Sequence, residues 1–490
     1  MVLRFRGNFT YWSILSIVIA IPIWIFVIYG SVMDRQYDGG IFLSISDGLA
    51  NGLNRYTDLW DNKDPFFAVA MAGASHISSP WAFFMDLFWI PLAAVGTFFI
   101  SRSIASPDRS LFFALVTTPF IMVGPAYMAG HGNTPGTAMV LFGWGMFLCR
   151  RWVLGGIAIG LLLFLKITVW PVGVAGLLLF LFFRDKRSGG VRALVAMGVT
   201  FVVSVTVMAI LGWIPGYIES ISQNRSYSKT TIAYFGFSDS FSGHLEKLQA
   251  DWAGSIFVAF LVMVSIAVVG LLFSSMKRRT HPEVFLVTVL LWIAIFGTIA
   301  SLALTYLWGH HLQAISLPMI LAAILFGSLL NVRIWFILWV GLLLILTFIL
   351  SMWMSPIQLF DHYKSLPAVF DSRVTEISEV PIDANLLNSI PLKDFSYARL
   401  GTNDDRGFLG SVREGAVLVC PRFQVFDFSP TEAFAELYEC IQRVDVILKT
   451  ENFNIFGNGM NAANVQPILD YVNANFDCLI VSDRQLCTRR

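Results

Sequence analysis

The sequence predicts a mainly α-helical, polytopic membrane protein that ends in a separate α/β domain, and three observations support this. Of the 490 residues, 56% are hydrophobic and 13% are charged, whereas soluble domains usually carry about 25% charged residues. The charges are also uneven, since residues 361–490 hold 30 of the 65 Asp, Glu, Lys and Arg residues. Apolar runs of membrane-spanning length recur before that point. We therefore expect a transmembrane domain over residues 1–355 and a second domain over residues 356–490.

The apolar runs predict about eleven transmembrane helices, because a helix that crosses the membrane needs about 20 apolar residues. The run 152–183 is too long for one span and is basic at both ends, so we divide it around Lys166 into two short helices. The run 65–77 is too short to cross and starts with proline, which favours a helix along the outer interface. The expected spans are 11–30, 82–104, 111–127, 134–149, 152–167, 168–183, 193–213, 253–275, 284–304, 312–330 and 333–353.

The distribution of charge assigns the two faces of the membrane. Of the 21 Lys and Arg residues in the first 360 positions, 14 fall in alternate loops, whereas 10 of the 14 acidic residues lie in the loops 31–64 and 214–252. Lys and Arg are retained on the cytoplasmic side. We therefore expect a multi-pass cell-membrane protein with a cytoplasmic N-terminus and a retained first helix. The loops 31–81 and 214–252 and the C-terminal domain are expected outside.

The C-terminal domain alternates strand-like and helix-like segments, which predicts an α/β fold. Residues 397–405 are interpreted as a loop. The expected strands are 416–419, 444–448 and 478–482, and the expected helices are 431–443 and 464–474.

Cysteine usage agrees with an outer location for this domain. Four of the five cysteines lie there, at Cys420, Cys440, Cys478 and Cys487. Two disulfides are expected, in any of three connectivities. Cys149, at a predicted inner helix end, is expected to be a free thiol.

The acidic loop after the first predicted span is the best indication of function. It places six aspartates and a lysine where membrane meets water. Glycosyl transfer needs a base for the acceptor hydroxyl, and a carboxylate suits this role when desolvation raises its pKa. Asp38 is the leading candidate, because two glycines follow it and allow close approach of a substrate. Asp34 is the alternative base, and Asp38 could equally cap a helix over residues 41–51.

This loop resembles the first external loop of bacterial GT-C glycosyltransferases. Residues 37–42 run Tyr-Asp-Gly-Gly-Ile-Phe, and residues 56–65 run Tyr-Thr-Asp-Leu-Trp-Asp-Asn-Lys-Asp-Pro. The order is similar to that in the protein O-mannosyltransferase and aminoarabinose transferase superfamily. The resemblance implies an inverting transfer from a polyprenyl-phosphate sugar donor at the outer face.

The resemblance also implies roles for single residues. Asp38 stands at the position of the proposed base, and Lys63 at the position of the lysine beside the carrier phosphate. Two residues depart from the family pattern: Phe42 stands where Tyr is common, and Asp64 where Pro or Gly is usual.

Further candidates lie near the predicted outer face. A helix that starts after His310 and His311 would direct its N-terminal amides at an anion, although histidines at an interface are equally common without a ligand. Lys166 lies in an apolar run, where a charge costs about 2.5–3.5 kcal/mol, so it should pair with Asp86 or contact phosphate. The expected donor-phosphate residues are Lys63, Arg55, His310, His311 and Lys166, and the expected substrate-binding residues are Tyr37, Tyr56, Trp60, Asp61 and His131.

The expected reaction requires no cofactor. A divalent cation is an open addition, because Asp58 and Asp61 would share one face of a helix; a solvated acidic loop is the favoured alternative for Asp58. The expected partners are a polyprenyl-phosphate sugar, a glycan, lipid or protein acceptor in the cell envelope, and the bilayer. A net charge of +1 gives no indication of nucleic acid.

Two other functions stay open. A transporter or flippase of lipid-linked sugars would also need an intramembrane charge, but we see no internal repeat of the kind that marks many transporters. A non-catalytic envelope scaffold would leave the acidic loop unexplained.

Overall fold

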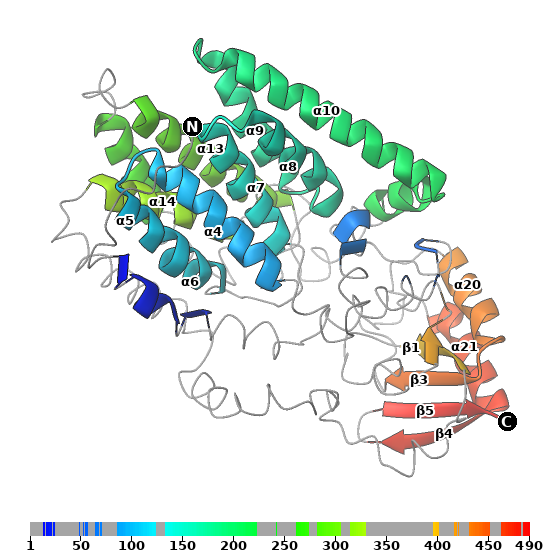
Figure 1. Cartoon of the computed structure of the whole chain (residues 1–490). Helices are drawn as coiled ribbons and strands as arrows, with labels where there is room; N and C mark the ends of the chain where they lie inside the picture. Colours follow the sequence, from blue (N-terminus) through cyan, green and yellow to red (C-terminus); the bar gives the residue numbers. More distant parts are fainter. Residues whose placement is uncertain are drawn as a thin grey trace. The chain divides into compact units, whose positions relative to one another are not determined.

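The structure is a computed structural model, and it divides the chain into two compact units that are described separately (Figure 1). The helical unit comprises Met1–Met33, Asp86–Ser204 and Ile232–Leu366, and the mixed unit comprises Asp34–Met85, Val205–Thr231 and Pro367–Arg490. The structure describes residues 86–123, 133–222, 261–273, 282–304, 314–329, 395–400, 416–418, 431–450, 462–481 and 484–490, with single residues and short runs elsewhere.

Apolar helices lie where the hydropathy of the sequence predicts them. In the described part, two segments are long and apolar enough to cross a membrane, Arg187–Ile210 and Pro282–Ser301. The predicted span 333–353 lies outside the described residues, and the total of about eleven spans stays a prediction. The helices are α4 (Asp86–Arg102), α5 (Pro107–Phe112), α6 (Thr118–Val123), α7 (Asn133–Leu148), α8 (Trp152–Leu165), α9 (Trp170–Phe182), α10 (Arg187–Ile210), α13 (Pro282–Leu304) and α14 (Ser316–Leu329), with a π-helical segment, η2 (Phe113–Thr117), between α5 and α6.

The expected break in the run 152–183 is confirmed. α8 ends at Leu165, and Lys166 leaves the helical conformation with φ −161° and ψ 86°. α9 then starts at Trp170 with a proline in its first turn, where the missing N–H costs nothing. Lys166 therefore lies in a turn between two short helices.

Glycines allow close packing in the helical unit. α4 and α7 cross at Gly96 and Gly145, where an added Cβ would come within 2.4 Å and 2.6 Å of the other helix's backbone. Gly156 and Gly160, spaced four apart on α8, face α10 in the same way. Small residues at this spacing are typical of helix contacts in membranes, where close van der Waals packing replaces the hydrophobic effect.

The outward surface of α10 is apolar. Val195, Val199 and Val202 are 58–62% exposed, and Figure 1 shows the helix running along the side of α8 and α9. A continuous apolar stripe of this kind is unfavourable in water and is typical of a surface that contacts lipid or another protein. It agrees with the predicted membrane location.

The C-terminal part of the mixed unit contains a five-stranded sheet with the order β2-β1-β3-β5-β4. β1 is parallel to both β2 and β3, whereas β5 is antiparallel to β3 and β4. The strands are β1 (Phe395–Leu400), β2 (Ala416–Leu418), β3 (Val446–Thr450), β4 (Phe476–Val481) and β5 (Arg484–Arg489), and the helices are α20 (Thr431–Ile441) and α21 (Ala462–Asn475).

Every strand and helix predicted for this region is present, but one loop assignment is wrong. Residues 397–400, expected in a loop, belong to β1, which pairs with a neighbour on each side. β5 was not predicted, because it is short and largely polar. β1 is extended because it pairs with strands later in the chain, and β5 is extended because it pairs with β3 and with the adjacent β4.

The buried core of this α/β region includes Cys420 and Cys487, one cysteine of each disulfide. Ile447 and Phe476 pack with Leu437 of α20 and Val472 of α21 in one buried cluster. The two expected disulfides are present, and the structure selects one connectivity, Cys420–Cys440 and Cys478–Cys487. Cys149 is a free cysteine, as expected.

Candidate functional site

The structure describes only part of the predicted site. Arg55, Tyr56 and Lys166 lie among the described residues, as does Asp64, the departure from the family pattern. The other predicted site residues lie outside the described residues: Asp34, Tyr37, Asp38, Asp58, Trp60, Asp61, Lys63, His131, His310 and His311.

The first part of the site is a turn that follows the end of α10. Gly212 has a φ of +70°, and its N–H donates to the Ala209 carbonyl at 3.1 Å, while the Trp213 N–H donates to the Met208 carbonyl at 2.9 Å. This pair of bonds is a Schellman motif, which glycine favours because it adopts positive φ without strain. Pro215 follows near the start of a helix over residues 214–222. We call the segment from Gly212 to Tyr217 the α10 corner.

Asn54 attaches the acidic loop to the α10 corner. Its side-chain oxygen accepts a hydrogen bond from the Trp213 indole N–H. Its amide nitrogen donates to the Leu211 carbonyl at 3.3 Å, one of the carbonyls at the end of α10 that lack an intrahelical partner. Asn54 therefore binds both the helix end and the residue that follows the turn.

Tyr56 and Arg55 fill the space beside this attachment. Tyr56 is buried with a φ of +69°, and its ring lies edge-on to Trp213 at a centroid distance of 6.5 Å. The guanidinium of the fully buried Arg55 lies 4.6 Å from the Tyr56 ring centroid. An added Cβ at Gly216 would lie 2.2 Å from the Tyr56 Cβ, so only glycine fits there. The left-handed Tyr56 is a strained backbone position of the kind that surrounding structure must stabilise.

Tyr217 makes the second attachment of the acidic loop. Its hydroxyl donates to the Asp64 carboxylate at 3.2 Å. Burial of Tyr217 and the negative charge of Asp64 raise its pKa well above the usual value, and the charge of Arg55 opposes this only in part. The hydroxyl therefore stays protonated and remains a donor. Asp64 precedes Pro65 and the helical residues 65–67, in the order expected of an N-cap followed by proline.

These residues form one contiguous set, which we call the outer-loop cluster: Asn54, Arg55, Tyr56, Asp64, Trp213, Gly216 and Tyr217. Sequence reasoning named Arg55 and Tyr56 as candidates for the site and did not name Asn54, Trp213 or Tyr217. The available signal was the Gly-Trp-Ile-Pro-Gly run at 212–216, which marks a tight turn directly after an apolar helix. Nothing in the sequence pairs that turn with a segment some 150 positions earlier.

Lys166 occupies a separate place, in the helical unit. A Cβ added at Gly136 would lie 3.2 Å from its Cβ, so the α8–α9 turn packs against the described start of α7. The other ends of α7 and α8 meet at Arg150 and Arg151. Lys166 therefore lies at the helix ends opposite these arginines. Asp86, its predicted partner, is the first described residue of α4, and the pairing stays a prediction.

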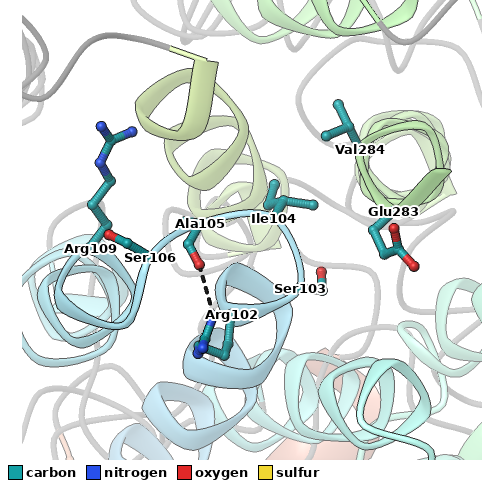
Figure 2. A pocket seen from close by; sticks show the side chains of 8 residues that line it. All are labelled: Arg102, Ser103, Ile104, Ala105, Ser106, Arg109, Glu283 and Val284. Carbon is teal, nitrogen blue, oxygen red and sulfur yellow. Dashed lines mark hydrogen bonds between the residues drawn. The ribbon is translucent and has the colours of Figure 1, made fainter. Parts of the chain in front are cut away.

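A polar pocket of about 390 Å³ lies between the α4–α5 turn and the start of α13 (Figure 2). Two arginines that line it donate to backbone carbonyls: Arg102 to Ala105 at 3.3 Å and Arg109 to Gly327 at 3.0 Å. Glu283 of α13 completes its charged lining. The charge pattern predicts a cytoplasmic position for these arginines, so the pocket is not a candidate for the outer site.

The possible divalent cation of the acidic loop stays a prediction. Within the described part of the chain, no three His, Cys, Asp or Glu side chains form a group that could hold a metal ion. Asp58 and Asp61, the pair suggested for a divalent cation, lie outside it.

Comparison with known proteins is informative at the level of the fold. No protein-family model and no curated protein matches the sequence. Among solved structures, ArnT from Cupriavidus metallidurans in the apo state is similar with a TM-score of 0.52 and 12% identity, over 97% of this chain and 97% of that chain. The chain has a GT-C-like fold. The predicted mainly helical fold with a small C-terminal sheet is confirmed.

A second solved structure is similar more weakly. It is the oligosaccharyltransferase of Archaeoglobus fulgidus in complex with Zn and sulfate, with a TM-score of 0.40, 12% identity, and coverage of 98% of this chain and 73% of that chain. At 12% identity, a GT-C-like fold leaves the activity of this chain to be argued from its own residues.

Proposed function

We propose that the protein is an integral-membrane glycosyltransferase of the GT-C type. It moves a sugar from a polyprenyl-phosphate donor to a glycan, lipid or protein acceptor at the outer face of the cell membrane. The outer-loop cluster is the observation that carries this proposal. Two residues of the motif that resembles the family, Tyr56 and Asp64, contact Trp213 and Tyr217 of the α10 corner, as expected of a loop that forms a site.

The proposed reaction is an in-line displacement. Asp38, with Asp34 as the alternative, removes the proton of an acceptor hydroxyl. The acceptor oxygen then attacks the anomeric carbon while the bond from that carbon to the phosphate oxygen breaks. Polyprenyl phosphate leaves with the bonding electrons, and the anomeric configuration inverts. A correctly placed general base contributes about 10²–10⁴-fold to the rate of such a step.

The leaving phosphate needs positive charge. Lys63 is proposed as the direct contact, with His310, His311 and Lys166 as further candidates. Arg55 is fully buried against Tyr56, so we assign it a contribution through its electric field, which acts more strongly where water is excluded.

The remaining candidates would contact the sugar or the acceptor: Tyr37, Tyr56, Trp60, Asp61 and His131. A divalent cation at Asp58 and Asp61 would add charge for the phosphate, but no step above requires it.

Radiolabelled polyprenyl-phosphate sugars, added to membranes with and without the protein, test this proposal. Transfer of label to an acceptor by the wild type is expected. Asp38→Asn should reduce the rate about 10²-fold or more if Asp38 is the base, while Asp34→Asn, its matched control, should reduce it far less. Label that crosses the bilayer unchanged would indicate a flippase instead. Label that neither moves nor crosses, over a range of sugars, would favour the scaffold.

A further inference from the structure

The pocket between the α4–α5 turn and the start of α13 has charges of both signs in its lining. Its volume of about 390 Å³ lies within the range of about 300–1,000 Å³ that is usual for small-ligand sites. Arg102 and Arg109 line the side formed by the α4–α5 turn, and Glu283 lines the side formed by α13 (Figure 2). A ligand in this pocket would therefore meet positive charge on one side and negative charge on the other.

Arg102 can bind an anion and keep its present contact. Its Nη1 donates to the Ala105 carbonyl at 3.3 Å, which uses one of the several N–H donors of a guanidinium. Within the described part of the chain, Arg102 makes no ion pair with an acidic residue. A guanidinium binds a phosphate through two parallel hydrogen bonds. Arg102 is therefore a suitable residue to contact a phosphate.

Arg109 and Ser106 add groups for the same anion. Arg109 donates to the Gly327 carbonyl at 3.0 Å, which fixes its guanidinium beside the pocket. Burial lowers the pKa of Arg109, because a charged group loses hydration when water is excluded. A bound anion would compensate for that loss. The hydroxyl of Ser106, which makes no capping hydrogen bond to α5, can donate to a phosphate oxygen.

Glu283 restricts the kind of anion that fits. It lies in the first turn of α13, where the helix dipole favours a negative charge. Among the described residues, Glu283 makes no ion pair with a basic side chain. Its carboxylate would repel a phosphate monoester with two negative charges, but would attract an ammonium group. The lining therefore matches a ligand that carries a phosphate diester at one end and an amine at the other.

The pocket lies at the end of helices suited to a membrane. α13, which starts at the pocket, is long and apolar enough to cross a bilayer. On α4, Phe88, Val95 and Arg102 are spaced seven positions apart, which places them on one face of the helix. Phe88 and Val95 are 56% and 43% exposed.

This exposed face of α4 is long enough for the acyl chain of a lipid. From Phe88 to Arg102 the helix rises about 21 Å, which exceeds the roughly 15 Å of hydrocarbon in one leaflet of a bilayer. An acyl chain can therefore lie along α4 while its headgroup occupies the pocket.

We propose that this pocket binds the headgroup of a zwitterionic phospholipid that contains a phosphate and an ammonium, such as phosphatidylethanolamine. The phosphate contacts Arg102 and Arg109, and the ammonium contacts Glu283. Because the charge pattern predicts a cytoplasmic position for the arginines, we expect the lipid to belong to the inner leaflet. The site goes beyond the proposed glycosyl transfer and does not depend on it.

Native mass spectrometry of the full-length purified protein in detergent tests this site. The protein is titrated separately with phosphatidylethanolamine and with phosphatidylglycerol, which share a phosphate diester and differ in the amine. The wild type should bind phosphatidylethanolamine about tenfold more tightly, the effect of one hydrogen bond between charged groups. Arg102→Gln should weaken the binding of both lipids about tenfold, because both contain the phosphate.

A second variant tests the amine without dependence on the folded fraction. Glu283→Gln should remove the preference between the two lipids, because an amide neither attracts the ammonium nor repels the phosphate. The ratio of the two affinities is measured in one preparation, so partial unfolding does not change it. Arg187→Gln is the matched control for Arg102→Gln. Arg187 also donates to a backbone carbonyl, that of Leu181 at 3.0 Å, but lies at the start of α10, and its variant should bind both lipids like the wild type.

Three results would overturn the proposal. Equal affinity of the wild type for the two lipids, or a preference that persists in Glu283→Gln, would exclude the contact between the amine and Glu283. Unchanged lipid binding in Arg102→Gln would exclude the phosphate contact. Displacement of the lipid by an equal concentration of inorganic phosphate would show that the pocket binds a soluble anion. None of these results changes the expected outcome of the assay with radiolabelled sugar donors.

Discussion

The outer-loop cluster and the pocket between α4 and α13 both contain arginines, but the two regions use them differently. In the pocket, Arg102 and Arg109 donate to backbone carbonyls and thereby stabilise a turn and the end of α14. In the cluster, Arg55 is fully buried against the ring of Tyr56, and its charge acts on the pKa of Tyr217, which donates to Asp64. Arg102 and Arg109 thus stabilise backbone groups, whereas Arg55 packs on an aromatic ring inside the cluster.

The largest effect is expected from a substitution that disturbs the outer-loop cluster without removing a charge. Gly216→Ala places a Cβ against Tyr56 and should lower the free energy of unfolding by about 1–3 kcal/mol, the range for overpacking a tight contact. Polyprenyl-phosphate binding should fall with it, because Arg55 rests on Tyr56. Thermal unfolding and binding measure the two effects.

Gly198→Ala is the matched control for that substitution. Gly198 lies on α10, and an added Cβ meets nothing within 4 Å. This variant should leave binding unchanged and should not lower stability. Equal loss of binding in both variants would contradict the assignment of the cluster to the site.

The next largest effect is on the pH dependence of stability, to which Tyr217 of the outer-loop cluster contributes. The pKa of Tyr217 is higher in the folded than in the unfolded protein, so above about pH 10 the unfolded chain releases a proton that the folded protein keeps. The free energy of unfolding should therefore fall by about 1.4 kcal/mol per pH unit from this residue. This stability is fully present below pH 10. Denaturant unfolding from pH 9 to 11 should show a steeper fall in the free energy of unfolding for the wild type than for Tyr217→Phe. Parallel curves for the two proteins would contradict the raised pKa of Tyr217.

The smallest effect concerns the pocket. Arg109→Ala removes a hydrogen bond to the Gly327 carbonyl and should lower the free energy of unfolding by about 1 kcal/mol, as for an ordinary hydrogen bond. Binding of polyprenyl phosphate per folded molecule should not change. A large loss of binding in this variant would show that the pocket, rather than the outer-loop cluster, contributes to the site.

Local sequence patterns predicted some elements of this chain and not others. The helix breaks around Lys166 and the positions of α20 and α21 follow from apolar periodicity and from proline, because these signals act over a few residues. β1 did not follow, since it is held by β2 and β3, which lie later in the chain. The disulfide connectivity is a similar case, because the cysteine count allows three pairings and only the folded core, in which Cys420 packs in one cluster with Leu437 of α20, brings Cys420 to Cys440.

The sequence alone determined that this is a chain of apolar helices with an acidic loop and a cysteine-containing α/β end, because composition, charge and periodicity are local properties. It also named Arg55 and Tyr56 as candidate site residues through the motif around them. Only the tertiary structure decided that Tyr217 meets Asp64 across 153 positions, and that Gly216 must be glycine for Tyr56 to fit. Contacts between distant segments depend on how helices pack, which no local pattern encodes.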